Sequence, residues 1–88
     1  MKVSVRIFGD LRKVLGHRRE VILAAGSTVS DLLERLDSGE RSVGLLEKFK
    51  SSAVYILLDG LNVELLDGVD TALKDGGVVS ILPPAGGG

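Results

Sequence analysis

The clearest structural signal in this 88-residue chain is one segment, Thr28-Val29-Ser30-Asp31-Leu32-Leu33-Glu34-Arg35-Leu36. Its apolar residues recur at helical spacing and form a single stripe: Val29, Leu32, Leu33 and Leu36. Thr28 is a favoured N-cap residue, and Asp31 stands where a capping box places its acidic side chain. The segment therefore predicts a helix that begins after Thr28 and buries one face. We expect Gly39 to end it in the left-handed conformation.

Two short strands are predicted before this helix. From Lys2 to Phe8 apolar and polar side chains alternate, which is the period of a strand with one buried face. A second strand is expected from Glu20 to Leu23, with Val21 and Leu23 inward. Between them, Gly9-Asp10 interrupts the pattern and residues 11–15 have the spacing of a helical turn. The two strands therefore form a hairpin with a long, partly helical connection.

The segments after the helix alternate between strands and turns. A short helix is expected from Val43 to Phe49, and residues 53–58 are apolar on both faces, as in an interior strand covered by a helix. A short strand is predicted from Asn62 to Leu65 and a final strand from Val78 to Leu82. Asp-Gly pairs at 59–60, 67–68 and 75–76 indicate turns between these elements.

This order of elements predicts a two-layer α+β domain. The crossover through the helix allows the last strand to lie parallel beside the first. That topology is the ubiquitin-like β-grasp, with a mixed sheet of four to five strands packed on one main helix. We expect residues 1–82 to form this domain and residues 83–88 to form a flexible C-terminal tail.

The composition excludes many kinds of chemistry. The chain has no Cys and a single His, His17, so it offers no thiol nucleophile, no His-based metal cage and no metal centre. Its formal net charge of −1 argues against a nucleic-acid binder, and its longest apolar run is too short to span a membrane. No phosphate-binding glycine motif is present. A cytoplasmic location is the default expectation.

Charge is distributed unevenly along the chain. Residues 1–20 carry a net charge of +4, whereas residues 59–75 carry a net charge of −4. This asymmetry could steer a protein partner. Equally, two solvated edges of the domain could differ in sign without any function.

The C-terminus follows the last strand with two prolines and almost no side chains. Pro83 and Pro84 cannot donate ladder hydrogen bonds and favour an extended exit from the domain. The residues beyond them, Ala85, Gly86, Gly87 and Gly88, are thin enough to enter a channel too narrow for an ordinary peptide. The reactive group presented there is the α-carboxylate of Gly88, which has no Cβ beside it. The pattern favours a terminal acyl group for another protein's active site over a frayed terminus.

At this point the sequence resembles the molybdopterin synthase small subunit family of ubiquitin-like sulfur carriers. The most specific part is the ending, Leu82-Pro83-Pro84-Ala85-Gly86-Gly87-Gly88; residues 8–12, 28–36 and 66–76 are similar to the family's first loop, first helix and the approach to its last strand. Small archaeal modifier proteins share the pattern. The thiamine-pathway carrier shares fold and tail but is usually shorter. Asp59-Gly60, Ala85-Gly86 and Leu82 depart from the family's commoner residues, and Leu82 replaces an aromatic side chain.

The resemblance implies a carrier subunit rather than an enzyme. An E1-like partner would use Mg-ATP to adenylate the Gly88 carboxylate, and a sulfur donor would convert it to a thiocarboxylate. Gly87, Gly86 and Ala85 would lie in a partner's channel, and Leu82, Pro83 and Pro84 would form the docking edge. The large subunit of molybdopterin synthase would then accept the sulfur. No cofactor would be bound stably by this chain.

Other functional interpretations of the same C-terminal tail stay open. A ubiquitin-like modifier would use Gly88 to form isopeptide bonds with protein lysines. A carrier for the thiamine or tRNA pathway would share the activation chemistry but deliver sulfur elsewhere. A β-grasp binding module would leave the tail without a role.

Overall fold

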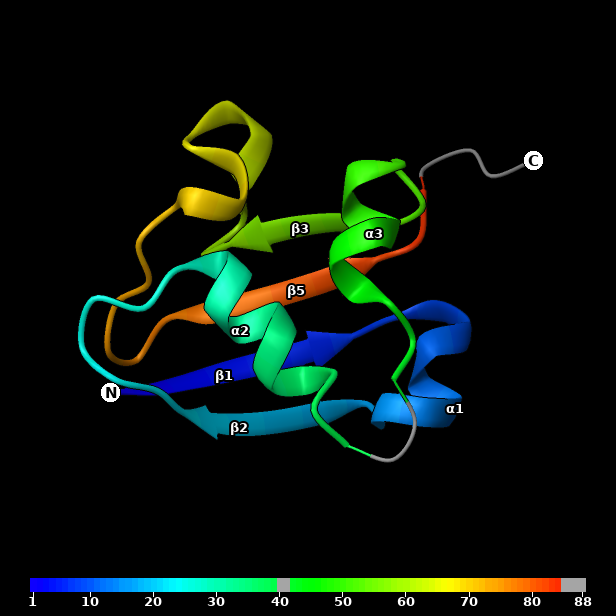
Figure 1. Cartoon of the computed structure of the whole chain (residues 1–88), viewed down its shortest axis with the longest axis horizontal. Coiled ribbons are helices and arrows are strands. Elements are labelled where there is room, and N and C mark those ends of the chain that lie inside the picture. The colour runs from blue at the N-terminus through cyan, green and yellow to red at the C-terminus, as the bar shows by residue number, and fades with distance from the viewer. Residues whose placement is uncertain (40–41, 85–88) are drawn as a thin grey trace.

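A five-stranded mixed sheet is the framework of the fold in a computed structural model that describes residues 1–39 and 42–84. The strands are β1 (Lys2–Ile7), β2 (Arg18–Ile22), β3 (Tyr55–Leu58), β4 (Leu61–Asn62) and β5 (Val78–Leu82), in the order β2-β1-β5-β3-β4 (Figure 1). β1 runs parallel to β5, and every other neighbouring pair is antiparallel. The predicted α+β class and β-grasp topology are confirmed.

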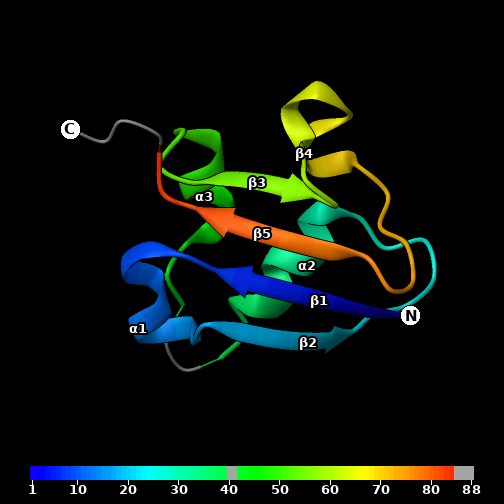
Figure 2. The same ribbon diagram turned by 180° about the vertical axis from the view of Figure 1, so that it is seen from behind.

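The helices cover one face of the sheet. The main helix α2 (Val29–Leu36) and the shorter α3 (Leu45–Lys50) lie on the same side, and the view from behind shows the strands in front of them (Figure 2). A single turn, α1 (Arg12–Leu15), lies in the connection between β1 and β2, where a helical turn was expected. None of the helices in the described ranges is long and apolar enough to cross a membrane.

The core lies between α2 and the sheet. All four residues of the predicted apolar stripe are at most 4% exposed, and they pack in one cluster with inward side chains of β1, β3 and β5: Val3, Val5, Ile7, Ile56, Val79 and Ile81. Full burial of such a side chain contributes about 1.5–3 kcal/mol. The capping box is also confirmed, because the Asp31 amide donates to Thr28 Oγ1 (3.3 Å) and the Thr28 amide donates to Asp31 Oδ2 (2.8 Å).

The end of α2 differs from the prediction. The helix ends at Leu36. Gly39 is not among the residues with positive φ, so the prediction that Gly39 adopts the left-handed conformation is wrong. Asp37 organises the connection instead. Its carboxylate accepts hydrogen bonds from the Val43 amide (2.7 Å) and the Leu45 amide (2.6 Å), which ties the end of α2 to the first turn of α3.

Several strand boundaries also differ from the sequence analysis: β1 ends at Ile7 rather than Phe8, and β3 begins at Tyr55 rather than Ala53. β2 begins at Arg18 rather than Glu20, because the ladder with β1 continues to the Arg6–Arg18 pair. The strand expected over Asn62–Leu65 is wrong beyond Asn62, since Val63–Leu65 form a 3₁₀ turn. There the Asn62 side chain accepts a hydrogen bond from the Glu64 amide (2.9 Å), which favours a turn over an extended ladder.

Candidate functional site

The parallel pairing of β1 and β5 fixes the point from which the C-terminal segment leaves the domain. Because the two strands run in the same direction, their carboxyl ends lie at one edge of the sheet (Figure 1). The register joins Ile7 to Ile81, and the Phe8 amide donates to the Ile81 carbonyl (3.0 Å). β5 ends one residue later at Leu82, since the prolines that follow have no amide proton to continue the ladder.

Pro83 lies against the backbone of Gly9. Gly9 has φ +77°, and a Cβ added there would lie 3.3 Å from Pro83 Cγ. A side chain at residue 9 would therefore be strained by its own backbone and would press on the first residue after β5. Sequence reasoning did not find this contact, although Gly9 directly after a predicted strand was a signal for close backbone approach.

Three consecutive residues, Leu82, Pro83 and Pro84, were predicted to form a docking edge, and that role stays a prediction. Leu82 is half-buried and pairs in register with Tyr55, Pro83 is exposed, and Pro84 is half-buried. Ala85, Gly86, Gly87 and Gly88 lie outside the described residues. Their expected roles in a partner's channel stay predictions.

An apolar hollow of about 310 Å³ opens beside Pro83. Its walls come from the loop after β1, from α3 and from the segment before β3: Phe8, Asp10, Leu11, Lys48, Ala53, Val54 and Pro83. This volume is at the lower end of the range for small-ligand pockets, about 300–1,000 Å³. The lining supplies apolar contact and two opposite charges, but no nucleophile beside a base. It can accept an apolar side chain of another molecule and has no arrangement for catalysis.

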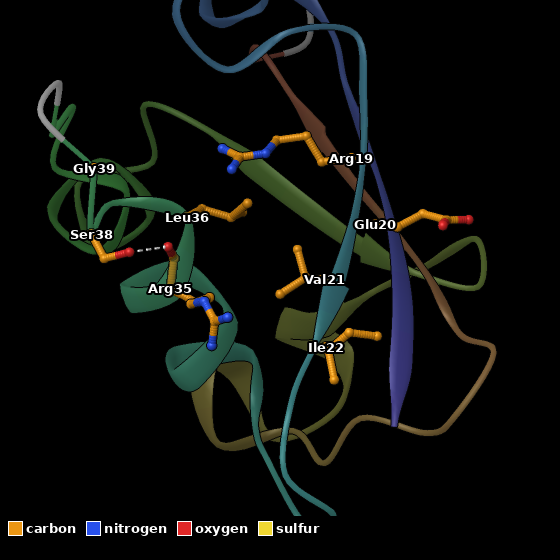
Figure 3. A pocket seen from close by; sticks show the side chains of 8 residues that line it. All are labelled: Arg19, Glu20, Val21, Ile22, Arg35, Leu36, Ser38 and Gly39. Atoms are coloured by element: carbon orange, nitrogen blue, oxygen red, sulfur yellow. Dashed lines mark hydrogen bonds between the residues drawn. The ribbon is translucent and has the colours of Figure 1, made fainter.

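A second hollow of about 310 Å³ lies between β2 and the end of α2 (Figure 3). Arg19 and Val21 project from β2 toward the helix, whereas Glu20 projects away from it, as strand alternation requires. Arg35 and Leu36 contribute from α2, and the Ser38 hydroxyl donates to the Arg35 carbonyl (2.7 Å). This hydroxyl is therefore engaged with backbone and is not activated by a neighbouring base.

The described residues contain no group of three or more His, Cys, Asp or Glu side chains that could hold a metal ion. His17 is exposed and lies in the connection before β2. The distinguishing feature of the domain is therefore a terminal segment anchored at one sheet edge, with an apolar hollow beside it.

Comparison with known proteins agrees with this arrangement. The ThiS family model matches residues 5–88. Small archaeal modifier protein 3 from Haloferax volcanii is 34% identical over 92 residues, which cover all of both chains. The structure of small archaeal modifier protein 1 from Methanosarcina acetivorans aligns with a TM-score of 0.76 and 30% identity, covering 99% of this chain and 96% of that one.

A chain from the complex of subunits 1 and 2 of molybdopterin-converting factor from Helicobacter pylori aligns with a TM-score of 0.66 and 31% identity, over the whole of both chains. These matches span nearly every residue, including the segment beyond β5. The chain therefore belongs to the ThiS family, a family of ubiquitin-like sulfur carriers and modifiers.

Proposed function

We propose that this chain is a sulfur carrier that donates sulfur in the biosynthesis of molybdopterin, the organic part of the molybdenum or tungsten cofactor. The observation that carries the proposal is the anchored start of the tail, Leu82 and Pro83, which we call the root of the tail. Pairing of β5 with β1 fixes the carboxyl end of β5, where Leu82 lies, and Pro83 lies against Gly9. From this fixed root, residues 84–88 lead to the carboxylate of Gly88.

The proposed chemistry takes place on an E1-like partner. An oxygen of the Gly88 carboxylate attacks the α-phosphorus of Mg-ATP, pyrophosphate leaves, and an acyl adenylate forms. A donor of hydrosulfide-level sulfur then attacks the acyl carbon, AMP leaves, and the terminus becomes a thiocarboxylate. ATP and Mg²⁺ belong to the partner's site, so the chain is a substrate and carrier and holds no cofactor stably.

Each part of the C-terminal segment has a distinct proposed task. Gly86 and Gly87 with Ala85 extend through the partner's channel, because they add almost no width to the backbone. Leu82, Pro83 and Pro84 remain at the channel mouth as the docking edge. The apolar hollow beside Pro83 gives the partner a second point of contact.

The large subunit of molybdopterin synthase is the proposed acceptor. Support comes from the likeness to a chain of the Helicobacter pylori complex of subunits 1 and 2 of molybdopterin-converting factor. In this proposal the thiocarboxylate sulfur bonds to a carbon of a pterin precursor bound by the large subunit. Water then cleaves the acyl–sulfur bond, so the sulfur stays on the precursor and the carboxylate of Gly88 is regenerated.

A second candidate function is conjugation to proteins. It is favoured by the 34% identity to small archaeal modifier protein 3 over the full chain. Activation at Gly88 would begin in the same way, but a lysine amine would displace the activating group and form an isopeptide bond. Carriers of the thiamine or tRNA pathway would share the thiocarboxylate and differ in the acceptor.

Intact-mass analysis of the protein from its native cell tests these functions. Replacement of one terminal oxygen by sulfur supports the carrier, and a series of heavier lysine conjugates supports the modifier. Deletion of Gly88 should abolish either product. Gly39→Ala is the matched control, because Gly39 lacks a positive φ and a Cβ there meets no atom of the described residues within 4 Å. An unmodified terminus, with no adenylate formed by any E1-like enzyme of the host, would refute both functions.

A further inference from the structure

Positive side chains gather near the edge from which the tail leaves. Four of them, together with the single histidine, line two adjoining hollows of about 220 and 250 Å³; we call these residues the basic cluster: Arg6, Arg12, Lys13, His17 and Arg18. Arg12 and His17 line both hollows, so the surface is continuous. All five side chains are exposed.

The basic cluster adjoins the root of the tail. Phe8 lines the larger basic hollow and also the apolar hollow that Pro83 lines. Its amide donates to the Ile81 carbonyl, and the neighbouring Ile7 amide donates to the His17 carbonyl, both at 3.0 Å. These backbone hydrogen bonds therefore hold His17, the end of β1 and the end of β5 next to one another.

Among residues 1–39 and 42–84, the charge of this cluster is poorly compensated. Arg6 and Arg18 lie directly opposite each other on β1 and β2, an arrangement of like charges that destabilises a sheet. Arg12 Nε donates to the Gly9 carbonyl (3.0 Å) rather than to an acid. In the part of the chain that the structure describes, Asp10 is the one acidic side chain that lines these hollows. The ion pair found among the described residues joins Lys2 to Glu20, toward the other end of β1.

The acidic part of the chain lies elsewhere. Residues 59–75, with a net charge of −4, follow β3 and reach the β4 edge and the start of β5. In Figure 1 this yellow-to-orange segment and the blue connection that contains α1 are at opposite corners of the sheet. The charge asymmetry of the sequence is therefore a spatial one, and the positive end is the one beside the tail.

We propose that the basic cluster is a docking surface for a carboxylate-rich protein surface beside the channel that receives the tail. The inference rests on the proposed function, because a partner that takes the tail into a channel must cover this edge. Complementary charge raises association rates by about 10–10³-fold and makes them sensitive to salt. A protein fits better than a nucleic acid, because the cluster adjoins the start of the tail, which the proposed function places in a channel of a protein.

Exchange of pyrophosphate into ATP by the host's E1-like enzyme tests the proposal. In the double variant Arg12→Glu/Arg18→Glu, kcat/KM should fall about 10–100-fold at 0.1 M salt, while kcat at saturating carrier stays unchanged. The loss should shrink at about 1 M salt, where the Debye length falls from about 10 Å to about 3 Å. The neutral pair Arg12→Gln/Arg18→Gln should give an intermediate loss.

The matched control is Arg35→Glu/Lys74→Glu, which makes the same charge change at two exposed positions outside the cluster. Its kcat/KM should stay close to that of the unmodified chain. Equal losses in both double variants would overturn the proposal, as would normal kcat/KM in Arg12→Glu/Arg18→Glu. Loss of binding to host RNA, with kcat/KM unchanged, would assign the cluster to RNA instead. An unmodified chain that supports no exchange with any E1-like host enzyme would refute the proposed function, and this inference with it.

Discussion

Replacement of Gly9 by alanine tests whether the root of the tail is held by the domain. Gly9 has φ +77°, and its added Cβ would lie 3.3 Å from Cγ, 3.4 Å from Cδ and 3.5 Å from Cβ of Pro83. The substitution therefore has two effects. It strains the backbone of residue 9, and it pushes on the residue that begins the tail.

The backbone effect follows from the positive φ of residue 9. An L-residue in this left-handed region costs about 1–2 kcal/mol, and the lower unfolded-state entropy of alanine offsets about 0.4–1 kcal/mol of that cost. The free energy of unfolding should therefore fall by about 1 kcal/mol, and Tm by about 4–8 °C in a domain of this size. Contact with Pro83 adds at most about 1 kcal/mol, because Pro83 is exposed and can shift by a few tenths of an ångström.

Gly26→Ala provides the matched control. Gly26 has φ +87°, and a Cβ there meets no atom within 4 Å, so it isolates the backbone term. Thermal unfolding followed by circular dichroism should place Gly9→Ala at or below Gly26→Ala in Tm. Carbon-detected NMR should show displaced Pro83 resonances in Gly9→Ala alone. Equal Tm values together with unchanged Pro83 resonances in both variants would refute the contact.

Two further substitutions test the packing of α2 and the connection that follows it. Asp37→Ala removes the acceptor of the Val43 and Leu45 amides, and should lower the free energy of unfolding in urea by about 1–3 kcal/mol. Asp37→Asn retains one acceptor oxygen and should lose less; equal losses would contradict the role of the Asp37 carboxylate as acceptor for these two amides. Leu32→Ala empties a fully buried position and should cost about 2–5 kcal/mol. The control is Leu65→Ala, at a side chain that is 74% exposed, which should change the free energy of unfolding by less than about 0.5 kcal/mol. Similar losses in Leu32→Ala and Leu65→Ala would contradict the assigned core.

Local patterns predicted the elements that make up the core. The apolar stripe and capping box of α2 lie within nine consecutive residues, and β5 was predicted with its observed bounds, Val78–Leu82. Both signals are short-range, because side-chain period and N-cap chemistry depend on immediate neighbours. The parallel contact of β1 and β5 followed from the order of elements.

The predictions that failed depended on side chains that compete for backbone groups. Asn62 accepts from the Glu64 amide and starts a 3₁₀ turn where a strand was expected. Gly39 was expected to end α2, but the chain after α2 is organised by Asp37, which accepts hydrogen bonds from two amides farther along the chain. In each case the residue types were visible, but several local partners were available, and the surrounding fold selected one of them.

The sequence by itself determined that a segment almost without side chains follows two prolines, that no Cys is among the 88 residues, and that a β-grasp domain precedes that segment. The tertiary structure alone decided what surrounds the root of that tail. Pairing of β1 with β5 joins residues more than 70 positions apart, and so brings Gly9, Phe8 and the basic cluster to Pro83. Such neighbours are set by strand register and chain crossover, and periodicity along the sequence carries no information about them.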